Sequence, residues 1–266
     1  MILECRGALL SSRSRFRTNK DCGIFYNILD KQKFGFTLAE VLITLGIIGV
    51  VAAITMPSLI QSFKEQVLIN QAKKSYSNFL NVLNRMMAEN EYVDYSPIFA
   101  TSGRTVESVI KDIANYYNGA RVCTAPGKGC GEQYYVKLGK ATNDGTGFVK
   151  KEGFGFPRML LVDGSSIYFR NIRSTCEPFT YTAPVKDENG FNTGETITAT
   201  DTRCATVVID VNGENKGPNQ YGADVHQILV QPQKLEPQDG KYGALKTIFL
   251  KNKLEYEKYS DDKKFD

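Results

Sequence analysis

Side chains that could perform chemistry are sparse along this chain. His226 is the only histidine in 266 residues, so a catalytic histidine base and a zinc site with several histidine ligands are both disfavoured. The sequence contains no G-x-S-x-G pattern and no glycine-rich phosphate loop after a strand-like run. We expect no catalytic residues and no enzymatic activity, and we interpret His226 as a packed or surface side chain.

One oxygen-rich segment could hold a metal ion. It covers residues 210–226 (DVNGENKGPNQYGADVH) and offers Asp210, Asn212 and Asp224 as hard oxygen ligands of the kind that suit calcium. Its D-x-N-G opening is similar to an EF-hand loop, but the bidentate glutamate that closes such a loop is missing. The alternative is a turn in which Asp210 and Asp224 accept hydrogen bonds from backbone amides. Both interpretations stay open, and calcium is the one cofactor that the sequence suggests.

Glu40 is unusual because it lies inside an apolar block. Residues 36–57 read FTLAEVLITLGIIGVVAAITMP, and Glu40 is their only charged residue. The 21 residues from Phe36 to Met56 would span roughly 30 Å as a helix, which matches the hydrocarbon core of a bilayer. We therefore predict a single transmembrane helix rather than a buried core helix.

An ionised carboxylate in an apolar membrane environment is energetically costly, so we expect Glu40 to have a partner of opposite charge. Cleavage after Gly35 would provide one, because the new α-amino group of Phe36 on a neighbouring subunit could neutralise Glu40. The alternative is a lone acid whose side chain reaches out to the membrane interface.

The flanking charges predict the orientation of this helix. Seven lysines and arginines precede the block, with Lys31 and Lys33 nearest to it. Positive charge on this flank keeps the N-terminus in the cytoplasm. We expect a single-pass protein of the inner (cytoplasmic) membrane with everything after residue 57 in the periplasm or outside the cell. A cleavable secretory signal fits less well, because no small-residue cleavage site closes the block.

Residues 33–57 resemble the prepilin cleavage and methylation motif. The shared features are Gly35 before the cut, the aromatic Phe36 after it, the acid Glu40 at the fifth mature position, and Pro57, which kinks the helix in that family. The resemblance implies a type IV pilin or a type II secretion pseudopilin. In that family a prepilin peptidase cuts after the residue matching Gly35 and methylates the new amine, here on Phe36. The acid matching Glu40 docks subunits into a filament.

The resemblance also implies partners and a metal site. The expected partners are the prepilin peptidase, other pilin or pseudopilin subunits, and an ATP-driven assembly platform in the inner membrane that extracts the helix from lipid. Major pseudopilins carry a calcium-binding loop late in the head, and residues 210–224 are similar to loops of this kind.

The leader is longer than the short basic leaders of the family. It covers residues 1–35, and no methionine lies between Met1 and Met56. A UUG start codon would be read internally as leucine, and Leu29 is well placed for it. We expect translation to start at Leu29, which leaves the leader (M)DKQKFG.

The cysteines agree with a translocated head. The first 35 residues hold two of the six, and the remaining four form an even set in an oxidising compartment. Of three pairings, we favour Cys123–Cys130, which closes a short loop, and Cys176–Cys204, which brackets a threonine-rich insertion that could form an edge hairpin. Free thiols are the alternative, and zinc is disfavoured because no C-x-x-C pair exists.

The pattern after Pro57 predicts an α+β, pilin-like fold. We expect one long helix with a transmembrane half at 36–57 and an amphipathic half at 58–91, followed by a globular head of antiparallel β-sheet at 92–266. Within the head we expect a short helix at 105–117, a hairpin over 159–169, a strand at 205–210 and a frayed tail from Lys251. The apolar stripe that should form core comprises Ile60, Phe63, Val67, Ala72, Tyr76, Phe79, Leu83 and Met86.

Two functional classes follow. One is a structural subunit that assembles through its N-terminal helix, and the other is a low-copy minor subunit whose head binds DNA, a glycan or a secreted substrate. The net charge of +4 does not mark a binding surface, because 7 of the 33 basic and 3 of the 29 acidic residues lie in residues 1–35. The predicted mature chain keeps 26 of each and is formally neutral, so we expect no specific nucleic-acid binding.

Overall fold

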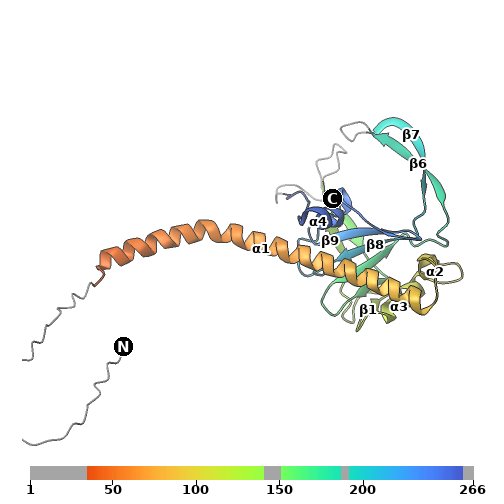
Figure 1. Cartoon of the computed structure of the whole chain (residues 1–266), viewed down its shortest axis with the longest axis horizontal. Helices are drawn as coiled ribbons and strands as arrows, with labels where there is room; N and C mark the ends of the chain where they lie inside the picture. Colours follow the sequence, from red (N-terminus) through yellow and green to blue (C-terminus); the bar gives the residue numbers. More distant parts are fainter. Residues whose placement is uncertain (1–34, 141–150, 187–191, 260–266) are drawn as a thin grey trace, which may run out of the picture. The chain divides into compact units, whose positions relative to one another are not determined.

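The computed structural model describes residues 35–140, 151–186 and 192–259 (Figure 1). The expected leader lies outside these residues, apart from Gly35. The chain divides between Ala52 and Ala53, within helix α1, into two compact units. Helix α1 (Leu38–Glu89) is 52 residues long, and in the described part of the chain it is the one helix long and apolar enough to cross a membrane.

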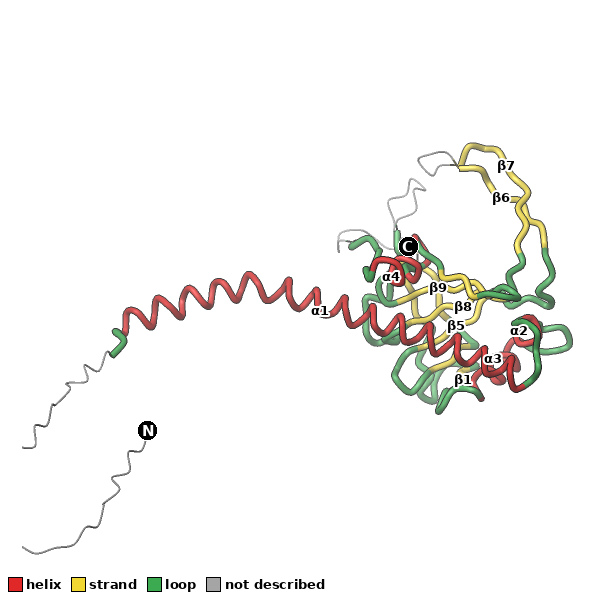
Figure 2. Tube along the Cα trace, viewed as in Figure 1, coloured by secondary structure: helices red, strands yellow, loops and turns green. Residues whose placement is uncertain are grey.

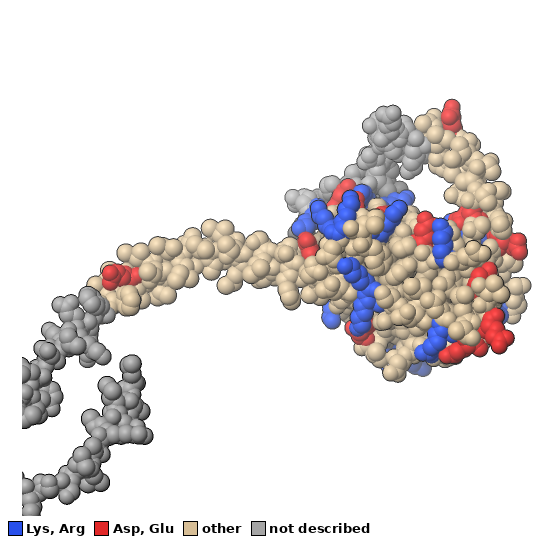
Figure 3. All heavy atoms as spheres, in the orientation of Figure 1, with Lys and Arg blue, Asp and Glu red and all other residues tan. Residues whose placement is uncertain are grey.

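The N-terminal part of α1 is apolar and exposed on every side. None of residues 38–50 is buried, and the large side chains there include Leu42 and Ile48, which are 60% and 63% exposed. Figure 3 shows this stretch as uncharged except near its beginning, where the sequence places its single acid, Glu40. A helix that is hydrophobic all round is buried in protein or in lipid, and no described residue covers this stretch.

The C-terminal part of α1 packs on the head, but the predicted stripe is only partly core. Buried side chains begin at Ile69 and include the predicted Ala72, Phe79, Leu83 and Met86. The prediction is wrong for the first three members of the stripe, since Ile60, Phe63 and Val67 are 51%, 69% and 37% exposed. Periodicity identifies an apolar face of a helix but not the length over which another element covers it.

The head is built on a six-stranded antiparallel sheet (Figure 2), which confirms the α+β class. Its strand order is β1-β4-β5-β8-β9-β10. The predicted hairpin is the pair β4–β5, and the predicted strand is β8, where every residue is buried. The strands are β1 (Arg121–Cys123), β4 (Arg158–Leu160), β5 (Ser166–Arg170), β8 (Ala205–Asp210), β9 (Val225–Val230) and β10 (Leu235–Pro237).

Two layers cover this sheet, and β8 contacts both. Val207 and Ile209 belong to the cluster that includes the buried residues of α1, α2 (Ser96–Phe99) and α3 (Val106–Asn115). Val208, between them, belongs to a second cluster with Val136 and Phe154 from the two-stranded sheet β2 (Tyr134–Lys137) and β3 (Lys151–Phe154). The alternation of a strand therefore gives the head a core on each face of the sheet.

The threonine-rich insertion forms the hairpin β6 (Phe179–Lys186) and β7 (Asn192–Asp201). It is a two-stranded sheet of its own and not an edge of the main sheet, which corrects the expected edge hairpin (Figure 1). The structure joins Cys176 to Cys204, and Cys123 to Cys130, which are the two pairings that the spacing favoured.

The C-terminal segment packs on the head up to the last described residue. After the 3-10 turn η1 (Gly240–Tyr242) and helix α4 (Leu245–Lys251), Leu254 is buried. Glu255 pairs with Lys140 at 2.7 Å, and the Tyr259 hydroxyl donates a hydrogen bond to Leu138 O at 3.0 Å. The prediction of a frayed tail from Lys251 is therefore wrong for the described residues up to 259. Between the charged residues of this segment lie Leu254, which is buried, and Tyr259, which forms a hydrogen bond with the head.

Candidate functional site

The start of α1 is closed by a reciprocal capping box between Thr37 and Glu40. The backbone N–H and the hydroxyl of Thr37 both donate to Glu40 Oε2 at 2.8 Å, and the N–H of Glu40 donates to Thr37 Oγ1 at 3.2 Å. This pair satisfies donors that every helix N-terminus leaves open. Sequence reasoning did not single out Thr37, although the spacing T-x-x-E is the known signal for such a cap.

The capping box holds the Glu40 carboxylate close to the expected cleavage point. Phe36 precedes Thr37 and its side chain is 87% exposed. Gly35 is also open, because a Cβ built there meets no atom within 4 Å. In the isolated chain, the residues at the expected cleavage point are accessible, and the Glu40 carboxylate accepts hydrogen bonds from Thr37 of its own helix.

Asp210 anchors the first half of the oxygen-rich loop. Its Oδ1 accepts hydrogen bonds from the N–H groups of Asn212 (3.3 Å) and Gly213 (2.8 Å), and its Oδ2 accepts from the Tyr134 hydroxyl (3.0 Å). Gly213 has φ +84°, and a Cβ there would lie 2.2 Å from Gly164 O. The turn therefore needs glycine at this position.

Asp224 anchors the second half of the same loop. Its carboxylate accepts from the N–H groups of Asn219 at 2.9 Å and Gln220 at 2.8 Å. Both aspartates thus accept backbone amides, as the turn interpretation requires. The structure brings Asp210, Asn212 and Asp224 into one loop, and the hydrogen bonds alone account for the shape of that loop.

Comparison with known families bears on the N-terminal segment. Residues 30–56 match the family described as the prokaryotic N-terminal methylation motif, the hallmark of type IV pilins and pseudopilins. The N-terminus of this chain is of the prepilin type. The resemblance drawn from residues 33–57 is confirmed, and the motif belongs to structural subunits rather than to an enzyme family. The match covers about a tenth of the chain and stops before the head. No curated protein and no solved structure matches the chain.

The loop in the head of this prepilin-type chain contains two perturbed carboxyl groups. Burial, and then the charge of Asp224, raise the pKa of Asp210 to about 7. Burial raises the pKa of Asp224 to about 6, although the N–H groups of Gln220 and Asn219 oppose the shift. Both pKa values lie above 3.8, the ordinary value of an aspartate. The two carboxyl groups therefore make their full contribution to the free energy of unfolding below pH 3.8, and this contribution is lost as the pH rises through 6 to 7.

His226 responds to pH in the opposite direction. It is fully buried, its Nδ1 accepts from the Ala244 N–H at 3.3 Å, and burial lowers its pKa to about 3. Its contribution to stability is complete above pH 6.5 and is lost as the pH falls toward 3. His226 is thus a packed neutral side chain rather than an exposed base.

The head also has oxygen atoms that could contact a cation. Asn212 Oδ1 and Asn219 Oδ1 are buried and accept no hydrogen bond in the described structure. They add neutral hard oxygens to the two aspartates, a donor set that fits calcium. Within the described residues, no three His, Cys, Asp or Glu side chains are placed to hold a metal ion.

A buried arginine connects this loop to the Cys123–Cys130 segment. The Arg158 guanidinium is fully buried and donates to Cys130 O, to Glu132 O at 3.0 Å and to Glu214 Oε2 at 3.0 Å. The ring of Tyr134 lies 5.3 Å from its Cζ. Arg158 therefore holds its own strand β4, residues 130–132 and the loop residue Glu214 together, and sequence reasoning did not identify it.

Proposed function

We propose that the chain is a subunit of a type IV pilus or of a type II secretion pseudopilus, processed after Gly35 and assembled through α1. The observation that carries the proposal is the methylation motif at residues 30–56, which is followed directly by an exposed apolar helix. Before assembly, the subunit is anchored in the inner membrane with its N-terminus in the cytoplasm and its head in the periplasm. Its partners are the prepilin peptidase, other subunits and the assembly platform.

The capping box gives this proposal a physical step. Cleavage creates an amine on Phe36, and the amine of one subunit competes with Thr37 for the Glu40 carboxylate of its neighbour. A hydrogen bond between two charged groups is stronger than one from a neutral hydroxyl or amide, particularly in an apolar surrounding. Assembly would then exchange a cap within one subunit for an ion pair between two.

Processing is tested by Gly35→Val. A Cβ at this position meets no described atom within 4 Å, so the fold of the described residues should stay unchanged. A β-branched side chain next to the scissile bond is expected to reduce cleavage at least tenfold when the chain is co-expressed with a prepilin peptidase. Mass spectrometry of the membrane fraction reads the result, and a mature chain beginning at Phe36 in normal yield would contradict it.

A minor subunit with a binding head is the second candidate. It is favoured by the β6–β7 hairpin, which lies outside the main sheet and exposes Tyr181 (45%) and Ile197 (55%). Copy number separates the candidates, because a major subunit forms the bulk of a filament and a minor subunit is present in few copies.

We also propose that calcium binds Asp210, Asn212 and Asp224, with Asn219 as a further oxygen donor. Ionised carboxylates bind calcium, so affinity should rise as the pH passes the raised pKa values of the two aspartates. About 5 mM calcium is expected to raise the Tm by roughly 3–8 °C at pH 8 and by much less at pH 5. The variant Asp210→Asn should abolish the difference in calcium-dependent Tm shift between pH 8 and pH 5, and the buried His226 is unchanged in this variant. If calcium does not shift the Tm of the wild type at pH 8, the calcium proposal is wrong.

A further inference from the structure

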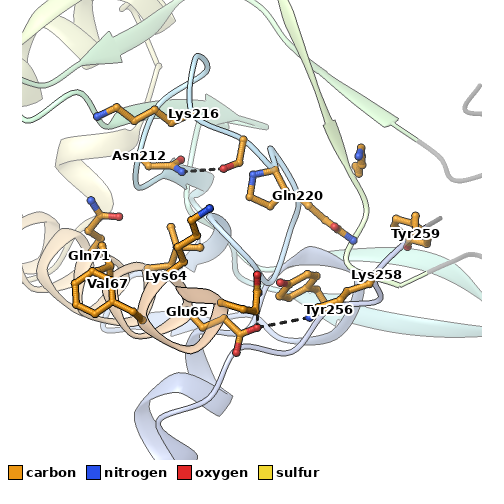
Figure 4. Close-up of a pocket in the computed structure, with 16 residues that line it drawn as sticks. Lys64, Glu65, Val67, Gln71, Asn212, Lys216, Gln220, Tyr256, Lys258 and Tyr259 are labelled. Carbon is orange, nitrogen blue, oxygen red and sulfur yellow. Dashed lines mark hydrogen bonds and ion pairs between the residues drawn. The ribbon is translucent and has the colours of Figure 1, made fainter. Parts of the chain in front are cut away.

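A cavity of about 840 Å³ lies in the head unit beside the exposed turns of α1 (Figure 4). Three segments supply most of its lining, which are residues 61–71 of α1, residues 212–220 of the β8–β9 loop and residues 256–259 after α4, and Lys137 of β2 completes it. The ion pair between Glu65 and Lys258, at 3.8 Å, crosses one side of it. Apart from Asn212, a proposed calcium ligand that also lines this cavity, the function described above does not use it.

Positive charge predominates in the lining. One acid, Glu65, lines the cavity against four lysines, which are Lys64, Lys137, Lys216 and Lys258. Lys64 points from α1 toward the β8–β9 loop in Figure 4, and Lys216 comes from that loop. Both side chains are exposed, and neither forms an ion pair with a described residue. The cavity therefore favours an anion.

The remaining lining is partly apolar and includes an unused acceptor. Phe63, Val67 and Leu68 form an apolar wall, and Phe63 is 69% exposed. Gln71 Oε1 is buried and accepts no hydrogen bond in the described structure. A ligand that fits all three features combines a negative group, a hydroxyl donor and an apolar part.

The position of the cavity along α1 indicates where such a ligand is found. Lys64 is the first charged residue after Glu40, and it follows Met56 by eight residues, about 12 Å along a helix. The intervening Leu59 and Ile60 are 70% and 51% exposed. Lysine and aromatic side chains beyond an apolar helix are typical of the membrane–water interface, and a lysine side chain can reach back toward it. In a membrane-inserted subunit, the distance along α1 would place Lys64 at the level of the phospholipid headgroups.

We infer that the cavity binds the headgroup of an anionic phospholipid that carries hydroxyl groups, of the phosphatidylglycerol class. Lys64 and Lys216 hold the phosphate, Gln71 Oε1 accepts a hydroxyl of the headgroup, and the acyl chains lie along Phe63. The inference depends on insertion of α1 into the membrane but not on filament assembly. Extraction of the subunit into a filament would then require release of this lipid.

Lipid binding is tested with the full chain in detergent micelles, by native mass spectrometry with dihexanoyl-phosphatidylglycerol or dihexanoyl-phosphatidylcholine. The wild type is expected to bind the anionic lipid at least tenfold more tightly. The double variant Lys64→Gln/Lys216→Gln should weaken that binding about 25-fold, which corresponds to about fivefold for each interfacial lysine. The control Lys128→Gln/Lys246→Gln also removes two exposed lysines, from outside the cavity, and should stay within twofold of the wild type.

Several outcomes would overturn the inference. The first is that phosphatidylcholine binds as tightly as phosphatidylglycerol. The second is that an equal concentration of inorganic phosphate displaces the lipid. The third is that a second copy of the chain fills the cavity, which would be observed as a dimer without bound lipid. Unchanged binding by the lysine variant would also do so. If the double variant fails to fold, Lys216→Gln alone, on an exposed loop, should weaken binding about fivefold. The unprocessed Gly35→Val chain should bind lipid like the wild type, so failure of processing and failure of lipid binding can be told apart.

Discussion

Exchanging Glu40 for glutamine is expected to abolish filament assembly while leaving the start of α1 capped. Glutamine can replace glutamate in a capping box, so the bonds from Thr37 can persist. It carries no charge to pair with the amine of Phe36. Removing one partner of a desolvated ion pair costs about 3 kcal/mol or more, a factor of roughly 150 at each subunit contact. Sedimentation of sheared filaments, quantified by immunoblot against processed subunit, measures the loss.

Thr37→Val is the matched control for this experiment. It removes the hydroxyl that serves the cap but keeps the Glu40 carboxylate, and loss of an N-cap costs about 1 kcal/mol. Near-normal assembly is expected. If Glu40→Gln assembles normally and Thr37→Val does not, then Glu40 acts through its own helix and the docking role is refuted.

Replacing Arg158 by methionine is expected to destabilise the head by about 3–5 kcal/mol. The change keeps much of the buried volume but leaves Glu214 without its cation and the carbonyls of Cys130 and Glu132 without their donor. Denaturant unfolding of the full chain in detergent, followed by tyrosine near-UV circular dichroism, measures the change.

Two further variants locate the origin of this loss. Arg121→Met also removes an arginine that donates to a backbone carbonyl, Lys128 O, but at an exposed site, and should cost less than about 1 kcal/mol. Glu214→Gln should destabilise the wild type yet leave the Arg158→Met variant unchanged or more stable, because it removes the unpaired charge. Additive effects of the two changes would show that their ion pair does not matter.

The sequence predicts local features of this fold well. The apolar block that ends at Met56 predicts the exposed, apolar part of α1 that is long enough to cross a membrane. The turn around Asp163 predicts β4–β5, and Thr105 precedes α3 and caps it through the Ser108 N–H. In the candidate loop, Asp210 and Asp224 could be identified because Asx turns depend on neighbours a few residues away.

Long-range contacts account for what the sequence does not predict. Tyr134 meets Asp210 across 76 positions, and Arg158 reaches Glu214 across 56. A charged residue flanked by Pro157 and Met159 gives no sign that it will be fully buried, because its partners come from two distant segments, residues 130–134 and Glu214. Phe63 was wrongly predicted to be core for a related reason, since helical periodicity contains no information on where the head begins.

The connection between β5 and β8 makes the head modular. These strands are antiparallel neighbours, so a short turn could join them, yet residues 171–204 intervene and carry the whole β6–β7 hairpin. Cys176 and Cys204 close that excursion at its base, with a sequence separation of 28. Closing a loop costs little more as the loop lengthens, so the residues beyond the disulfide can change in length and sequence without disturbing the sheet. We expect the segment between Cys176 and Cys204 to accept an inserted epitope or fluorescent label without loss of the main sheet.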